Sequence, residues 1–306
     1  MLIVNLAGGV GNQLFQYSMG YNLSVKYNIP VVFSDTFDQY DYNFPKIKNI
    51  FHVEIEECNS QQLKKVMPPF FSSSFARRGL AKLIALSGRQ LLPGIICDLY
   101  DGYTPIVISD VTRNYYFHGT WQSERYFGDF KKQVLDTLVF KQPRCLSEIN
   151  SEHSEHQVNI GVQIRRGDYI TNPKTKSKLG AQSLDYYVSY IEMLRAKFPE
   201  SAIYVFSDDI TWAKDHLSAV FNEIYFAEGK DFNAESDLQM LTQCHHFVLS
   251  NSTFGWWGAY LSNNKNSIVV TPSRWCADGT NMTGLIPAAW DKSKSDLEAQ
   301  HRVECL

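Results

Sequence analysis

The chain has 306 residues, of which 44% are hydrophobic and 20% charged, and its formal net charge is −3. This balance is typical of a globular protein long enough for two domains, and it excludes a strongly basic nucleic-acid-binding protein. The six cysteines are scattered without the spacing of a zinc site, the opening residues lack the basic segment of a signal peptide, and no apolar run approaches the roughly 20 residues of a membrane-spanning helix. We therefore expect a cytoplasmic protein.

The first half of the chain opens as an α/β protein does. An apolar strand is predicted at residues 2–6, followed by the turn Gly8-Gly9-Val10-Gly11-Asn12 and a helix at 13–26. Such a unit brings backbone N–H groups close to phosphate, although the spacing here is not G-x-G-x-x-G. The next predicted elements are a strand at 31–33, a mostly helical stretch at 47–92, a strand at 113–118 and a helix at 126–138.

A polar stretch at residues 141–157 contains Pro143 and predicts a domain boundary, which gives domains 1–150 and 151–306. The second half then alternates strands and helices with short connections. Strands are predicted at 158–164, 202–207, 224–226, 246–249 and 268–270, and helices at 184–197, around Trp212 and Leu217, at 234–244 and at 253–262. This succession predicts a parallel sheet with helices on both faces.

Two adjacent arginines follow the strand at 158–164. In an open α/β sheet, ligands bind beyond the carboxyl ends of the strands, where Arg165 and Arg166 would present planar groups suited to a diphosphate. Gly167 allows the backbone to approach a ligand, and Asp168 adds an acceptor or a base. The alternative is a solvated Arg–Asp pair at the end of a surface strand.

Asp208 and Asp209 follow the strand at 202–207. We expect one of them to cap the next helix. The alternatives are that they accept N–H groups of a guanine ring, or that they bind a divalent metal, for which the sequence shows few further oxygen ligands.

A third strand end, after residue 249, carries Ser250-Asn251-Ser252-Thr253 just where a helix is predicted to begin. These residues are good helix caps, and the N–H groups of a first helical turn form an anion site. Gly255 and Gly258 lie inside this helix, where each costs about 1 kcal/mol relative to alanine. They indicate the close approach of another group.

Three stretches together resemble bacterial α-1,2-fucosyltransferases of glycosyltransferase family eleven: GGVGNQLFQY at residues 8–17, IRRGDY at 164–169 and SNSTFGWWG at 250–258. They come in the family's order and at its usual separations. The resemblance implies an α/β, GT-B-like fold with two Rossmann-like domains and a cleft between them. Domain 1–150 would be the acceptor side, and domain 151–306 would bind GDP-fucose. It also implies an inverting, metal-independent transfer of L-fucose from GDP-β-L-fucose to the 2-hydroxyl of a terminal galactose in an O-antigen or similar oligosaccharide.

The wider group's H-x-R-R-x-D motif holds the donor diphosphate, which implies that Arg165 and Arg166 stabilise the leaving group. Asp168 would act as the base or would orient an arginine. Gln163 stands where the motif has histidine; its amide hydrogen-bonds but carries no charge. The remaining donor contacts implied by the resemblance are Gly11, Asn12, Gln13, Asp208, Asp209, Asn251, Ser252, Thr253 and Phe254. No metal or other cofactor is expected.

The expected partners are GDP-fucose and a galactose-terminated or lipid-linked glycan, without nucleic acid. Residues 75–86 are basic on one side and apolar on the other, which fits either a helix packed on the first domain or a peripheral contact at the inner membrane surface. The aromatic residues proposed to contact the acceptor are Tyr40, Tyr42, Phe44, Tyr115, Tyr116 and Trp121. The alternative functions are fucosyl transfer with α-1,3 or α-1,6 linkage, and a nucleotide-sugar-binding module without catalysis.

Overall fold

The computed structural model describes residues 1–34, 47–66, 94–98, 102–152, 157–229, 232–262, 264–280 and 282–290. It divides into two compact units, Met1–Lys141 with Asn281–Leu285, and Gln142–Thr280 with Ile286–Leu306. The boundary predicted after residue 150 thus falls inside the second unit. The return of residues 281–285 to the first unit has no signal in the sequence pattern.

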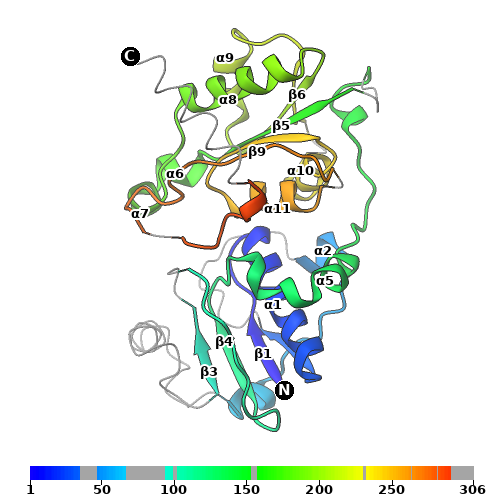
Figure 1. The fold of residues 1–306 in the computed structure, drawn as a ribbon, viewed down its shortest axis with the longest axis vertical. Helices are drawn as coiled ribbons and strands as arrows, with labels where there is room; N and C mark the ends of the chain where they lie inside the picture. The colour runs from blue at the N-terminus through cyan, green and yellow to red at the C-terminus, as the bar shows by residue number, and fades with distance from the viewer. Residues whose placement is uncertain are drawn as a thin grey trace. The chain divides into compact units, whose positions relative to one another are not determined.

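The first unit contains a parallel sheet of four strands in the order β2-β1-β4-β3 (Figure 1). The strands are β1 Leu2–Asn5, β2 Val31–Ser34, β3 Ile95–Cys97 and β4 Tyr115–His118. Strand β3 was not predicted, because only three residues of it pair. The order reverses between β1 and β4, which lie side by side at the centre of the sheet.

Helix α1 (Val10–Tyr27) follows β1 and is almost entirely buried in its first half. The shorter helices of this unit are α2 Ile47–Ile50, α3 Ser60–Lys64, α5 Lys131–Thr137 and the 3₁₀ turns η2 Glu124–Tyr126 and η3 Gly128–Phe130. The prediction of one continuous helix at 126–138 is wrong. The backbone leaves helical geometry at Phe127, whose φ is −131° and ψ 14°, so two 3₁₀ turns precede a short α-helix.

The second unit contains a parallel sheet of five strands in the order β7-β6-β5-β8-β9. The strands are β5 Asn159–Ile164, β6 Ala202–Ser207, β7 Ile224–Phe226, β8 His246–Leu249 and β9 Val269–Val270. The helices are α6 Gly167–Thr171, α7 Pro173–Lys178, α8 Leu184–Lys197, α9 Ile210–Leu217, α10 Ala234–Leu241 and α11 Thr253–Tyr260, with the 3₁₀ turn η4 at Leu146–Glu148.

Both faces of this sheet are covered. Ile203 and Val205 of β6 pack with α8 and α9, whereas Tyr204 and Phe206 pack with α10 and α11 on the opposite face (Figure 1). This alternation is the period of two that a strand imposes on its side chains. The predicted α/β architecture with two Rossmann-like domains is confirmed.

No helix within the described ranges is both long and apolar enough to cross a membrane. The amphipathic stretch at 75–86 lies outside the described residues, as do Tyr40, Tyr42 and Phe44.

Candidate active site

The strand order of the second unit reverses at β5, the central strand. The chain runs outward from β5 through β6 to β7 on one side and continues through β8 to β9 on the other. The turns that follow β5 and β8 therefore diverge at the carboxyl edge of the sheet. Open α/β sheets bind their ligands at this kind of position. Arg165 and Arg166 lie in the first of these turns, and Asn251 and Ser252 lie in the second.

Asp208, at the end of β6, holds the turn that carries the arginines. Its Oδ1 accepts the main-chain N–H of Arg166 at 2.8 Å, and its Oδ2 accepts that of Gly167 at 3.0 Å. Oδ2 also lies 3.1 Å from Nη1 of Arg165. A Cβ at position 167 would come within 2.6 Å of the same oxygen, which explains the glycine. The carboxylate proposed for guanine is thus engaged with the arginine turn.

Arg165 is paired on both terminal nitrogens. Nη2 lies 2.7 Å from Oδ1 of Asp168, and Nη1 meets Asp208. Asp168 thus contacts an arginine directly. The hydroxyl of Tyr169, beside this pair, donates to the main-chain oxygen of Asn251 at 2.9 Å, and this hydrogen bond links the turns after β5 and β8.

Among the described residues, Arg166 makes hydrogen bonds along only one edge of its guanidinium group. Its Nε lies 3.1 Å from Oδ2 of Asp209, while Oδ1 of Asp209 accepts the N–H of Trp212 at 3.3 Å and caps α9. The prediction that one of the two aspartates caps this helix is confirmed. Within the described part of the chain, Nη1 and Nη2 of Arg166 make no hydrogen bond or ion pair. The two guanidinium groups also oppose the binding of a metal cation by these carboxylates.

Gln163 lies beneath this edge and is only 4% exposed. Its Oε1 accepts the hydroxyl of Ser250 at 2.6 Å, and a Cβ at Gly255 would come within 2.7 Å of that oxygen. At Gly258, a Cβ would meet the side chain of Leu241. The expected close approach at both glycines is confirmed, and the approaching groups are side chains of the protein itself.

Asn251 is 1% exposed and joins three loops. Its Nδ2 donates to the main-chain oxygens of Leu179 and Trp275 at 2.8 Å, and of Gly180 at 3.2 Å. Its Oδ1 accepts an N–H of Gln182 at 3.3 Å. The structure thus places this predicted donor contact in the interior, where its amide orders the loops around the site.

The other predicted residues of this turn divide between capping and packing. Ser252 caps α11, because its Oγ accepts the N–H of Phe254 at 3.3 Å. Phe254 packs partly buried against the core, and Thr253 is partly exposed at the first position of the helix. Thr253 and Phe254 are therefore both partly exposed at the start of this helix.

In the first unit, Gly11, Asn12 and Gln13 lie in the first turn of α1, which begins at Val10, earlier than predicted. Gln13 is buried, with Nε2 donating to the main-chain oxygen of Gly8 at 2.8 Å and Oε1 accepting the N–H of Ile47 at 3.0 Å. Its amide thereby braces the glycine-rich turn. Asn12 is partly exposed and accepts a hydrogen bond from Gln122 at 2.9 Å.

Residues 99–285 match the family model for glycosyl transferase family 11. The chain belongs to this family. It is 27% identical over 281 residues to an alpha-1,2-colitosyltransferase of Escherichia coli, an alignment that covers 90% of this chain and 92% of that protein. It is 26% identical over 298 residues to the O-antigen biosynthesis glycosyltransferase WbnK of Escherichia coli, covering 93% of this chain and 98% of that protein.

A galactoside 2-alpha-L-fucosyltransferase SEC1 of Bos taurus is 32% identical over 104 residues, which are 34% of this chain and 28% of that protein. Among solved structures, the fucosyltransferase NodZ from Bradyrhizobium aligns with a TM-score of 0.50 at 13% identity, covering 89% of this chain and 96% of NodZ. This likeness supports the fold. The resemblance to family eleven is thus confirmed, and with it the class of glycosyltransferases.

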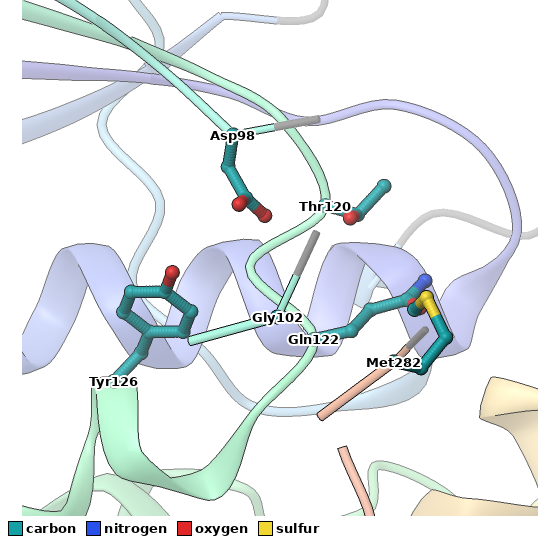
Figure 2. Close-up of a pocket in the computed structure, with 6 residues that line it drawn as sticks. All are labelled: Asp98, Gly102, Thr120, Gln122, Tyr126 and Met282. Atoms are coloured by element: carbon teal, nitrogen blue, oxygen red, sulfur yellow. The ribbon is translucent and has the colours of Figure 1, made fainter. Parts of the chain in front are cut away.

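The first unit of this family 11 enzyme has a small hollow at the carboxyl edge of its sheet (Figure 2). The residues that line it are Asp98, Gly102, Thr120, Gln122, Tyr126 and Met282. Its enclosed part has room for about one water molecule. Oδ2 of Asp98 accepts the N–H of Trp121 at 2.8 Å, so this carboxylate also fixes the turn after β4.

Three aromatic residues proposed for the acceptor belong to the core of this unit. Tyr115, Tyr116 and Trp121 are at most 5% exposed, and the Trp121 ring meets Tyr126 edge-on at 5.4 Å between ring centres. Their burial corrects the expectation that they contact the acceptor.

Asp98 and Trp212 lie at these sites but are part of no motif in the sequence. Asp98 directly follows the apolar residues of β3, just as Asp208 directly follows β6. A carboxylate after an apolar run was therefore a signal in the sequence that could have identified Asp98. Trp212 was recognised only as part of a helix, because its contact with Arg166 depends on the pairing of β5 with β6.

Proposed function

We propose that this family 11 glycosyltransferase transfers L-fucose from GDP-β-L-fucose to the 2-hydroxyl of a terminal galactose, with inversion at the sugar carbon. The acceptor is a surface glycan such as an O-antigen repeat. The names of its relatives support both parts of the proposal, since they include an O-antigen biosynthesis enzyme and a galactoside 2-alpha-L-fucosyltransferase.

One observation carries the assignment: a braced arginine pair at the point where the strand order of the second unit reverses. Departure of GDP places negative charge on the diphosphate. Arg166 offers to this charge two nitrogens that have no partner among the described residues, and Arg165 adds its positive charge beside it. Preorganised charge of this kind contributes several kcal/mol of barrier lowering. The two guanidinium groups take the part that a metal plays in other transferases, so the proposed reaction uses no metal or other cofactor.

We assign Asp168 the orientation of Arg165, because Oδ1 is already engaged there at 2.7 Å. An oxocarbenium-like transition state needs little assistance from a base, since the bond to the leaving group is largely broken before the hydroxyl attacks. The acceptor hydroxyl then loses its proton late, to solvent water, after the bond to the departing GDP is largely broken.

Within the second unit, Thr253 and the first-turn N–H groups of α11 are proposed to lie near the phosphates of the donor. Gly11 and Asn12, in the first turn of α1, remain proposed donor contacts. If Asp209 also recognises guanine, its carboxylate must bind the base in addition to capping α9 and pairing with Arg166. Contact of residues 75–86 with the inner membrane surface is retained as part of the proposal for a lipid-linked acceptor.

A second candidate is colitosyl transfer. The relative of that name aligns over 90% of this chain, whereas SEC1 aligns over 34%. The arginine turn would serve either donor sugar, since it is assigned to the diphosphate. Fucosyl transfer to another hydroxyl and sugar-nucleotide binding without catalysis are the further alternatives.

The test is to incubate the purified protein in EDTA with GDP-fucose, with and without lactose or N-acetyllactosamine. GDP release and the product are followed by mass spectrometry, with GDP-colitose as a competing donor and GDP-mannose and UDP-galactose as controls. We expect acceptor-dependent GDP release from GDP-fucose. Turnover of GDP-colitose alone would favour the second candidate, loss of turnover in EDTA would contradict metal independence, and failure to bind any guanine nucleotide would overturn the proposal.

A further inference from the structure

The indole ring of Trp212 lies against the guanidinium group of Arg166. The guanidinium carbon is 3.9 Å from the centre of the ring, well within the range of a cation–π contact. Trp212 belongs to the first turn of α9, and nothing in its own sequence neighbourhood marks it as a site residue. Its partner is the arginine whose two terminal nitrogens are unpaired within the described residues.

The ring is itself fixed. It packs against the buried cluster formed by β5, β6, α8 and α9, and its centre is 6.5 Å from that of Tyr187. The imidazole of His216 stacks on it, with 4.6 Å between ring centres. The main-chain N–H of Trp212 is bound by Asp209, the same carboxylate that pairs with Nε of Arg166. The first turn of α9 thus holds the guanidinium group both by its Nε edge and by its face.

Arg165 offers a contrast. Both of its terminal nitrogens are paired with carboxylates, and its guanidinium carbon is 5.7 Å from the ring of Tyr169. Stacking on Trp212 uses no hydrogen-bond donor, so it fixes the plane of Arg166 while leaving the fork of terminal nitrogens available. A planar fork of this kind matches two phosphate oxygens at once.

We propose that Trp212 is a positioning residue that holds the guanidinium plane of Arg166 for the diphosphate of the nucleotide donor. This inference rests on the proposed function. A long arginine side chain that is already ordered loses little rotamer freedom when it binds, so the stack strengthens phosphate binding without touching the donor.

The test compares the affinities of GDP and guanosine, measured in EDTA by titration calorimetry. Trp212→Leu is expected to weaken GDP binding about tenfold, the size of the rotamer freedom that ordering one arginine side chain costs, and to leave guanosine within about twofold. Trp212→Phe keeps a weaker aromatic face and should weaken GDP binding about threefold. The matched control is Trp290→Leu, since Trp290 is also partly buried in the second unit but packs on Trp256.

A double-mutant cycle completes the test: in an Arg166→Ala background, Trp212→Leu should weaken GDP binding no further. Equal losses for GDP and guanosine, or unchanged GDP binding by Trp212→Leu, would overturn the positioning role. If Trp212→Leu does not fold, Trp212→Phe decides by the same GDP-selective criterion. A wild-type protein that binds no GDP would instead overturn the proposed function, and the inference with it.

Discussion

Gly255 lies so close to Gln163 that an added Cβ would come within 2.7 Å of the Gln163 Oε1 atom. Helix α11 and the end of β5 therefore touch through a glycine and a buried amide. The amide is held in turn by the hydroxyl of Ser250 at 2.6 Å. The position at which the wider group carries histidine is thus part of the interior of this protein, below the arginine turn.

This contact makes Gly255→Ala destabilising. The methyl group must displace Gln163 or move α11, and overpacking of this kind costs about 1–3 kcal/mol. Urea unfolding followed by circular dichroism measures the change. Gly128→Ala is the control, since a Cβ there meets no atom within 4 Å. Equal stability of the Gly255 variant and the wild type would show that the glycine is not required.

Arg166→Ala should lower turnover by at least about a hundredfold while leaving the fold intact, since it removes the open fork proposed to stabilise the departing diphosphate. Initial rates of GDP release, normalised to folded protein, give the measurement. Arg195→Ala is the control, because the side chain of Arg195, on α8, bonds within the described ranges only to the main-chain oxygen of Asn222. Near-normal turnover of folded Arg166→Ala would contradict the assignment.

Asp168→Asn separates the orientation of Arg165 from general-base catalysis. Asparagine retains an oxygen that can accept the hydrogen bond now made at 2.7 Å, so turnover should fall by less than about tenfold. Asp168→Ala, which removes the acceptor, should lose more. The comparison is of kcat at saturating donor. A loss beyond a hundredfold in the asparagine variant, with a sound fold, would instead identify Asp168 as an obligatory base.

Asp237 makes the stability of the second unit depend on pH. Burial on α10 raises the pKa of this carboxyl to about 7, against the partial opposing effect of Arg144, and its Oδ1 has no hydrogen-bond partner within the described ranges. The folded state therefore binds more protons than the unfolded state between about pH 4 and 7, so the stabilising contribution of the neutral carboxyl declines across this range and is fully lost above the folded pKa of about 7.

Asp237→Asn should accordingly gain stability relative to the wild type as pH rises from 4 to 7, with a slope approaching about 1.4 kcal/mol per pH unit. Above pH 7 the difference should level off. Urea unfolding of both proteins at pH 5, 6, 7 and 8 provides the test. A difference that does not change with pH would show that the carboxyl is ionised in the folded protein.

The sequence predicted those elements that local signals define. Helix α8 begins and ends where predicted, because Ser183 caps its first turn and its buried residues recur with helical spacing. Strands β6, β7 and β8 also coincide with their predicted ranges. The sequence pattern predicted no helix between residues 164 and 184, yet α6 and α7 lie there, because elements of so few residues are too short to give a periodic signal.

For the site, the sequence located the strand ends but could not assign the partners of their side chains. Asp208 and Arg166 are 42 positions apart, and their hydrogen bond exists only because β5 and β6 pair in register. Similarly, an amide side chain such as that of Asn251 is a residue type that often contacts ligands. Only the structure shows that it is buried among three loops and donates to their main-chain oxygens. The local sequence around a polar residue does not reveal which distant residue it will bond to.

Residues 281–285 complete the first unit from near the far end of the chain. Thr283 accepts the main-chain N–H of Tyr103 at 3.2 Å, and the main-chain oxygen of Gly284 accepts the hydroxyl of Ser123 at 2.6 Å. During synthesis, the first unit must therefore wait for almost the whole second unit to be translated before its last contacts can form. The N-terminal part of this enzyme begins folding first and finishes among the last.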